Sequence, residues 1–214
     1  MIRYNRQSIR LKNYNYGAKG LYFITICCKN MQHLLGRVQD GKMQLNPIGL
    51  IALKEWYATE KIRDNCKIHE SVIMPNHIHG VIEITSTKNP FIKPVRFESP
   101  SHTIGSIVRG FKISSIKKIK EFLNDEITFS SDFLLNENNA SSMFTGESEP
   151  SLYTSLISPV SPNISQKIKS LEFKIWQRNY YDRIIRDKRA YINIVNYINS
   201  NPLKWWESRS IKIP

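Results

Sequence analysis

The sequence predicts an α+β fold with a ferredoxin-like, split βαβ antiparallel sheet that carries helices on one face. Three observations lead to this prediction. Short β-branched and aromatic runs alternate with longer runs in which apolar residues recur at helical spacing. Two strand-like runs are separated only by Pro75 and Asn76, which is typical of a hairpin. The order strand, helix, strand, strand, helix, strand, followed by a terminal helix, matches the split βαβ pattern in its first six elements.

The first strand and the first helix are predicted near the N-terminus. Residues 1–19 are basic and polar without sustained periodicity, so we expect an arm or loop. Residues 21–28 form an apolar run with the composition of a buried strand. A helix should then begin at Pro47, with Asn46 as its N-cap, and end near Arg63.

The middle of the chain supplies a small excursion and the hairpin. Gly36 and residues 40–41 mark turns before the first helix. The two hairpin strands should be residues 67–74 and 77–84. After a loop, apolar residues recur at helical spacing from Ile104 to Ile119 among lysines and arginines, which predicts a long amphipathic helix with a basic outer face.

The last third contains an insertion and two further elements. Residues 121–172 are rich in Ser, Asn, Glu and Pro without a clear period, so we expect a largely flexible insertion. A strand should follow near residues 180–186, and Asp187 should cap a last helix that ends at Pro202. The expected organisation is one domain, made of residues 1–120 and 173–206, with a tail at 207–214.

Net charge is the strongest feature of the composition. The 214 residues include 31 Lys and Arg against 18 Asp and Glu, a net charge of +13. Residues 121–170 hold seven acidic residues against two lysines, so the rest of the chain carries +18. Such a field attracts nucleic acid or an anionic membrane surface, although a basic surface also serves solubility alone. No apolar run approaches the ~20 residues of a membrane-spanning helix, so we expect no membrane attachment.

The three cysteines are Cys27, Cys28 and Cys66. They form neither a CxxC pair nor an even disulfide framework, which favours a reduced, cytoplasmic setting. We expect all three to fill the core, because a free cysteine usually behaves as a small buried hydrophobe.

His77 and His79 are the first candidates for chemistry. Two residues apart in a strand, they leave the same face with Cα atoms about 6.6–6.8 Å apart, while Ile78 points to the helix-covered face. Both imidazoles can therefore converge on one divalent ion and leave coordination positions for substrate oxygens. The pair alone is weak evidence, because two histidines on one face of a strand need not bind metal.

The last helix offers a nucleophile and an oxygen ligand. A rotation of 100° per residue puts Tyr197 and Asn201 on one flank, four residues apart and therefore neighbours. Because Asn201 precedes Pro202, we expect it at the frayed end of the helix. A tyrosine on a helix flank can equally well pack with its hydroxyl in water.

The chain resembles a known family in three motifs. Residues 72–82 read VIMPNHIHGVI, residues 176–186 read WQRNYYDRIIR, and residues 197–202 read YINSNP. Residues 8–12 and 22–27 are similar as well. In this order they resemble the REP-associated tyrosine transposases, the domesticated branch of the small HUH transposases of bacterial insertion sequences. The resemblance covers residues 3–120 and 173–206.

The resemblance implies a mechanism and its residues. His77 and His79 would be the metal ligands of the HUH motif on a central strand, and Tyr197 the nucleophile on a C-terminal catalytic helix. Asn201 would be the third ligand, where related transposases often have Gln. The family uses Mg²⁺ or Mn²⁺, and two imidazoles favour Mn²⁺. The product would be a covalent 5′-phosphotyrosine and a free 3′-hydroxyl, so rejoining would need no ATP.

The expected partner is single-stranded DNA, in hairpin-forming repeats, bound by a monomer or homodimer. Interleaved basic and aromatic residues are typical of single-strand binding, although residues such as Trp176 and its neighbouring tyrosines more often pack in the core. Our candidates for DNA contact are Arg10, Lys12, Arg109, Lys112, Trp176, Gln177, Arg178 and Arg183.

Two alternatives remain open at this point. One is a non-catalytic single-stranded nucleic-acid-binding protein of the same fold, in which Tyr197 does not react. The other is an unrelated metal hydrolase that uses His77 and His79, which would leave the match at residues 197–202 unexplained.

Overall fold

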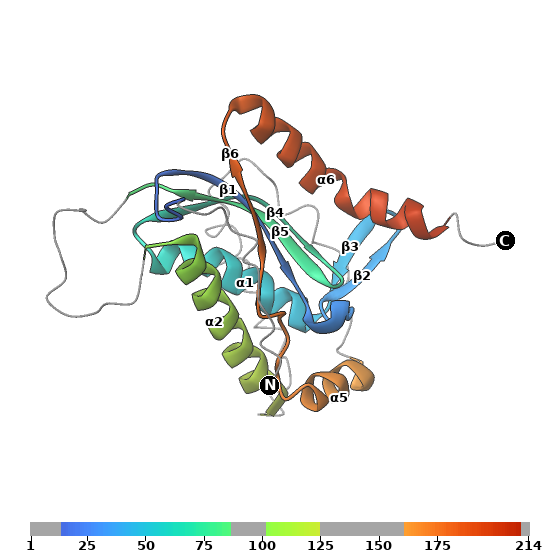
Figure 1. Cartoon of the computed structure of the whole chain (residues 1–214). Coiled ribbons are helices and arrows are strands. Elements are labelled where there is room, and N and C mark those ends of the chain that lie inside the picture. The colour runs from blue at the N-terminus through green and yellow to red at the C-terminus, as the bar shows by residue number, and fades with distance from the viewer. Residues whose placement is uncertain (1–13, 87–101, 125–160, 211–214) are drawn as a thin grey trace, which may run out of the picture.

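The predicted α+β fold and antiparallel sheet are confirmed. We describe a computed structural model of the chain at residues 14–86, 102–124 and 161–210. Its main sheet has four antiparallel strands in the order β4-β5-β1-β6, so β5 is central as predicted (Figure 1). The strands are β1 (Gly20–Cys27), β4 (Cys66–Met74), β5 (His77–Ile84) and β6 (Tyr181–Ile185).

Helices cover both faces of this sheet. The helices α1 (Pro47–Ile62) and α2 (Ile104–Asn124) lie on one face, and α6 (Lys188–Ser210) crosses the other (Figure 1). The main core lies beneath α1 and α2, where Trp56 and Phe111 pack edge to face with ring centroids 5.3 Å apart. A smaller apolar cluster, defined by Val72, Met74, Val81, Ile185, Ile194 and Ile198, lies beneath α6.

Capping residues determine where two of the helices begin. The side chain of Asn46 accepts a hydrogen bond from the Gly49 backbone N–H at 2.9 Å, and Pro47 is the first residue of α1. The carboxylate of Asp187 accepts from the Ala190 N–H at 2.7 Å at the start of α6. Both predicted helix starts are confirmed, as is the end of α1 at Arg63.

The predicted end of the last helix is wrong. Helix α6 continues through Pro202 to Ser210, so the expected tail from residue 207 still belongs to the helix for four residues. Proline removes one backbone donor and disfavours helix at the preceding residue. Packing beyond it favours continuation, because the Trp205 ring contacts the rings of His33 and His77 at 5.6 and 5.9 Å between centroids. Asn201 therefore lies inside the helix, not at a frayed end.

The predicted insertion is too long at both ends. Residues 121–124 belong to α2, and α5 (Pro162–Ser170) is an additional helix. Ile168 of α5 is fully buried in the main core, which explains why this short polar helix is folded. Residues 125–160 lie outside the described part of the chain.

The excursion marked by Gly36 and residues 40–41 is a small hairpin. It follows the 3-10 turn η1 (Lys29–Met31) and consists of β2 (Gly36–Gln39) and β3 (Lys42–Leu45). Gly41 has a φ of +72°, and a Cβ there would be 2.9 Å from Leu203 of α6. The hairpin turn therefore packs closely against the C-terminal half of α6.

Gly80 lies where the central strand meets α1. A Cβ at this position would be only 2.5 Å from Cζ2 of Trp56, which is buried. We expect Gly80→Ala to lower the free energy of unfolding by about 1–3 kcal/mol, because a close-packed core cannot accept the extra methyl without strain. Urea denaturation measures this loss. Phenylalanine at position 56 has a smaller ring that relieves the clash, so in a Trp56→Phe protein the Gly80→Ala substitution should lower the free energy of unfolding by less. An equal loss in both proteins would contradict this explanation.

The remaining expectations on burial also hold. Cys27, Cys28 and Cys66 are free and buried. Burial raises the pKa of each thiol, so all three stay protonated at neutral pH.

Among the described helices, we find none with the length and apolar character needed to span a bilayer.

Candidate functional site

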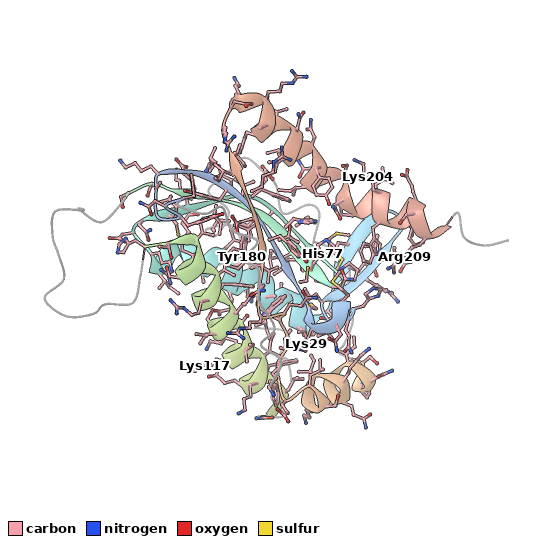
Figure 2. All side chains as sticks on the ribbon, in the orientation of Figure 1. Lys29, His77, Lys117, Tyr180, Lys204 and Arg209 are labelled. Carbon is pink, nitrogen blue, oxygen red and sulfur yellow. The ribbon has the colours of Figure 1, made fainter. Side chains whose placement is uncertain are left out.

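Strand β5 places the two predicted ligands side by side. His77 and His79 face α6, while Ile78 between them is buried in the main core on the opposite face, as the two-residue period predicts. The two imidazole rings have centroids 4.5 Å apart and are 9% and 6% exposed. They are therefore close enough to act on one ligand while largely shielded from water. Figure 2 labels His77 on the sheet beneath α6.

The ring of His77 has a defined tautomer. The amide nitrogen of Asn76 donates to the Met31 carbonyl at 3.1 Å, which leaves the amide oxygen facing Nδ1 of His77 at 2.6 Å. That oxygen only accepts, so Nδ1 carries the proton and Nε2 has a free lone pair. A hydrogen bond of this kind orients a metal-binding histidine and makes it a better ligand.

His79 connects the sheet to the predicted nucleophile. Its Nδ1 lies 2.8 Å from Oγ1 of Thr25 on β1, and its Nε2 lies 3.3 Å from Oη of Tyr197 on α6. When Thr25 accepts from Nδ1–H, the bare Nε2 accepts from the tyrosine hydroxyl. The Phe23 ring stacks on the His79 imidazole with ring centroids 5.2 Å apart. This stacking holds the imidazole in the orientation that makes both hydrogen bonds.

Burial keeps both histidines neutral. Desolvation lowers the pKa of His77 to about 4, with a smaller contribution from His33. It lowers the pKa of His79 to about 3, with a smaller contribution from His77. At neutral pH both rings therefore retain a lone pair, which is the form that binds metal.

Helix α6 supplies the remaining two predicted residues. Tyr197 is 42% exposed, and its ring lies edge-on to Phe23 and 6.0 Å from the ammonium of Lys204. Asn201 follows one turn later and is 8% exposed. Within the described residues, no cluster of three or more His, Cys, Asp or Glu side chains could hold a metal, so a third protein ligand here would have to be of another type.

A groove of about 480 Å³ opens beside Tyr197. Phe23 and Tyr197 line it, and Arg183 of β6 and Arg189 of α6 contribute positive charge alongside the carboxylate of Asp187. Arg183 pairs with Phe23 across the sheet and therefore shares its face, as alternation in a strand requires. Of the predicted DNA contacts, Arg183 is the one that lies at this groove. Three further residues that line it are not predicted as DNA contacts from the sequence: Phe23, Arg189 and Asn193.

Two other predicted DNA contacts have structural partners instead. The Trp176 ring is 6% exposed, packs 5.4 Å from Phe111 between centroids, and donates from Nε1 to Ser115. Trp176 is therefore a core residue, which is the alternative to base stacking that the sequence leaves open. Lys112 donates to the carbonyls of residues 177, 178 and 179 at 2.8, 3.3 and 3.0 Å, and burial lowers its pKa to about 8.

The other predicted contacts lie on α2, on the segment before β6 or outside the described residues. Gln177 is half-buried, with its backbone N–H bonded to the Cys27 carbonyl, and Arg178 is exposed on the loop before β6. Arg109 is exposed on α2, across the sheet from His77. Arg10 and Lys12 lie outside the described residues.

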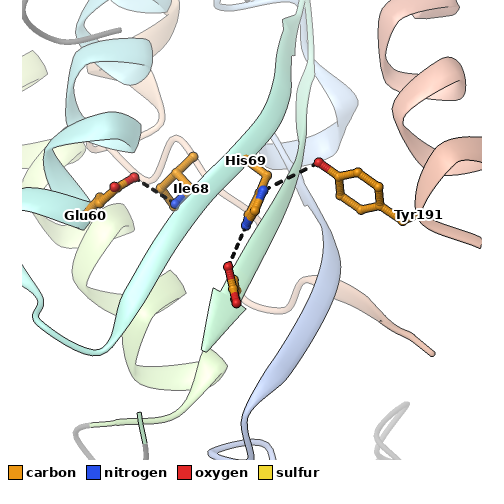
Figure 3. Close-up of polar contacts among 5 residues, drawn as sticks. Glu60, Ile68, His69 and Tyr191 are labelled. Atoms are coloured by element: carbon orange, nitrogen blue, oxygen red, sulfur yellow. Dashed lines mark hydrogen bonds and ion pairs between the residues drawn. The ribbon is translucent and has the colours of Figure 1, made fainter. Parts of the chain in front are cut away.

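A second tyrosine on α6 also meets a histidine. Nδ1 of His69 on β4 lies 3.5 Å from the hydroxyl oxygen of Tyr191 (Figure 3). Nε2 of the same ring lies 2.8 Å from the Glu83 carboxylate. Burial, then the charges of Glu70 and Glu83, raise the pKa of Tyr191. This contact anchors the first turns of α6 on β4, and the raised pKa leaves less of Tyr191 as phenolate at neutral pH.

Beside β4, Glu60 of α1 accepts from the Ile68 N–H at 2.8 Å, next to an irregularity in the β4–β5 pairing (Figure 3). This bond satisfies a backbone donor at the point where the strand register shifts. It fixes β4 against α1 on the face opposite His69.

Comparisons with known proteins place the chain in a family. No family model matches it. A REP-associated tyrosine transposase, solved bound to a REP hairpin, has a TM-score of 0.46 and 15% identity, covering 92% of this chain and 74% of that one. A Deinococcus radiodurans protein provisionally named a transposase has a TM-score of 0.38 and 13% identity. The match covers 88% of this chain and 94% of that protein's chain. An uncharacterized Haemophilus influenzae protein is 35% identical over 210 residues, 94% of this chain and 91% of that protein. The chain belongs to the same family as this Haemophilus influenzae protein.

Proposed function

We propose that the protein is a metal-dependent HUH transposase of the REP-associated type, which cuts and rejoins single-stranded DNA through Tyr197. The observation that carries this proposal is the contact between α6 and β5, in which Tyr197 Oη lies 3.3 Å from Nε2 of His79, whose ring neighbours the ring of His77. These are the residues that the motif resemblance assigns to nucleophile and metal ligands, and 118 residues of chain separate the tyrosine from His79.

Two neutral imidazoles fit a divalent metal ion. His77 has a free Nε2 held in place through Asn76. His79 has its Nδ1 bonded to Thr25, so a metal ion would take the Nε2 lone pair that faces the Tyr197 hydroxyl at 3.3 Å and would displace that hydrogen bond. Asn201 is our proposed third ligand, through its amide oxygen. When bound, Mn²⁺ or Mg²⁺ would draw charge from a phosphate oxygen of the DNA.

Tyr197 performs the covalent step in this proposal. Its Oη attacks the phosphorus of a phosphodiester, the bond to the 3′ oxygen breaks, and that oxygen takes up a proton as a free 3′-hydroxyl. The tyrosine proton passes to water, which the half-exposed ring can reach. A 5′-phosphotyrosine results, and attack by a 3′-hydroxyl reverses the step and restores the ester. One ester replaces another, so no energy source is needed.

The direct test is formation of the covalent product. Labelled single strands containing a hairpin with flanking unpaired residues are incubated with protein and Mn²⁺, then resolved under denaturing conditions. We expect a protein-linked band with hairpin and single strand and little with perfect duplex, because the nucleophile needs an accessible, bendable strand. Binding without any linked product would favour the non-catalytic alternative, and turnover without a linked product would favour the hydrolase.

Arg183 should contribute to binding at the groove. We expect Arg183→Gln to weaken binding of a single strand and to reduce the slope of log affinity against log salt by about 0.7, the value for one phosphate contact. Fluorescence anisotropy at several salt concentrations measures both effects. Lys117→Gln on α2 changes net charge equally and is the control. Equal effects of the two substitutions would show that only overall charge matters.

A further inference from the structure

Two adjacent tyrosines at the start of the edge strand β6 lie in opposite environments. Tyr180 is 8% exposed and belongs to the main core, and the ammonium of Lys112 lies 5.9 Å from its ring centroid. Tyr181, the first residue of β6, is 58% exposed. Its side chain makes no hydrogen bond, ion pair or ring contact with any other residue in the described part of the chain. Packing therefore accounts for Tyr180 but not for Tyr181.

Strand alternation puts Tyr181 on the face of the sheet that carries the candidate catalytic residues. Tyr181, Arg183 and Ile185 are each two residues apart and share one face. Ile185 is buried beneath α6 in the smaller apolar cluster, and Arg183 lines the groove beside Tyr197. Because β6 leads directly into α6, Tyr181 lies at the end of the strand that is farther from the start of this helix (Figure 1). Its ring is therefore on the α6 face and yet remains exposed.

The pairing register aligns Tyr181 with His79. Thr25 of β1 pairs with Tyr181 on one side and with His79 on the other. Since neighbouring strands are about 4.7–4.9 Å apart, the Cα atoms of Tyr181 and His79 are separated by about 9–10 Å. All three side chains leave the same face, and Oγ1 of Thr25 lies 2.8 Å from Nδ1 of His79. A nucleotide joined to a phosphate at His79 and Tyr197 therefore has the Tyr181 ring within reach.

Basic residues flank this ring along the chain. Arg178 on the preceding loop, Arg183 within β6 and Arg186 just after it are all exposed. Asp182 leaves the opposite face, because it pairs with Ile24, which is buried in the main core. Aromatic rings among cations are typical of single-strand binding, since the rings stack on bases and the cations contact phosphates. The same charges would repel a second copy of this edge, which disfavours pairing between two β6 strands.

We propose that Tyr181 stacks on the base of an unpaired nucleotide next to the bond that Tyr197 cuts, while Arg183 contacts the phosphate backbone in the groove. The proposal deepens the proposed function and rests on it. It assigns base contact to Tyr181 and not to the core residues Trp176 and Tyr180. The DNA strand then runs along the edge strand β6.

The test asks which DNA position depends on the Tyr181 ring. Binding is measured by anisotropy in the Tyr197→Phe protein, so no strand is cut. The probes are one hairpin oligonucleotide with unpaired flanks and a series in which each flanking position in turn lacks its base. Tyr181→Thr removes the ring and keeps a residue that favours strands. We expect it to weaken binding of the intact probe about 5- to 150-fold, and to cause little further loss with the probe that lacks the stacked base.

Two further variants separate stacking from other effects. Tyr181→Phe keeps the ring and should retain most of the affinity. The slope of log affinity against log salt should stay unchanged in both Tyr181 variants, because neither loses a charge. Ile113→Ala removes a similarly exposed apolar side chain from α2 and should leave binding unchanged.

Three results would overturn the proposal. The first is an unchanged affinity of the Tyr181→Thr protein for the intact probe, and the second is a loss that is equal for every probe. The third is self-association in sedimentation velocity without DNA that Tyr181→Thr abolishes, since the ring would then serve contact between two copies. Formation of the covalent product by protein with native Tyr197 is scored separately, so a failed stacking site and a failed transposase assignment are distinguishable.

Discussion

Replacing Tyr197 by Phe is expected to abolish the covalent protein–DNA product, with cleavage falling about 10³-fold or more. The substitution removes only the hydroxyl that lies 3.3 Å from His79 Nε2, and the ring keeps its contacts with Phe23 and His79. DNA affinity and the unfolding midpoint should therefore change little. A denaturing gel with labelled DNA measures the product, and anisotropy measures the affinity.

Tyr191→Phe is the matched control. Tyr191 is also on α6, and its hydroxyl also lies near a histidine, His69, but that histidine is paired with Glu83 (Figure 3). We expect this variant to cleave at nearly the wild-type rate. If Tyr197→Phe still forms the product while Tyr191→Phe does not, the nucleophile has been assigned to the wrong turn of the helix.

The second large effect is expected at His77 and His79. Replacing either by Ala should lower both Mn²⁺ affinity and cleavage about 100-fold or more, because one of two imidazole ligands is lost. Chelator should do the same to the wild-type protein. Calorimetric Mn²⁺ titration measures binding without depending on the DNA reaction, and circular dichroism checks that each variant is folded.

His69→Ala is the control for loss of a histidine from the same hairpin. Its imidazole bonds to Glu83 and faces Tyr191, away from the His77–His79 pair. Mn²⁺ binding and cleavage should survive. Full cleavage by wild-type protein in chelator would remove the metal from the proposal but would leave Tyr197 as a candidate nucleophile.

Local sequence signals predicted most of the sheet and the helix starts. The Pro75–Asn76 break marks the β4–β5 turn, and the period of two puts His77 and His79 on one face. Asn46 and Asp187 mark helix starts because their side chains bond the first backbone N–H groups. These features depend on residues a few positions apart, so they can be read from the chain directly.

Features that depend on distant contacts were missed or misjudged. Pro202 predicts a helix end, but Trp205 packs against His33 and His77, more than 120 residues earlier. Trp176 lies among arginines, and nothing local shows that Ser115 binds its indole N–H. Lys112 has the spacing of a basic outer face, yet its partners are the carbonyls of a loop 65 residues and more away.

The residues that line the groove beside Tyr197 also could not all be predicted from local sequence signals. Arg183 is predicted as a DNA contact because it lies near aromatic residues in the sequence. Phe23 is recognisable from the sequence only as a strand residue, and its place beside Arg183 follows from the pairing of β1 with β6. Arg189 lies in the first turn of α6, where a basic residue has no evident role in the sequence. Its place in the groove follows from the crossing of α6 over the sheet, which sequence periodicity alone does not give.

Locating the DNA-linked residue tests the central claim most directly. The wild-type protein is allowed to react with a single-stranded hairpin substrate and Mn²⁺, the DNA is trimmed with nuclease, and peptides are sequenced by mass spectrometry. We predict a nucleotide 5′-phosphate on Tyr197 and on no other tyrosine. A linked nucleotide on Tyr191 or any other residue, or an unmodified Tyr197 under conditions in which the strand is cut, would contradict the account.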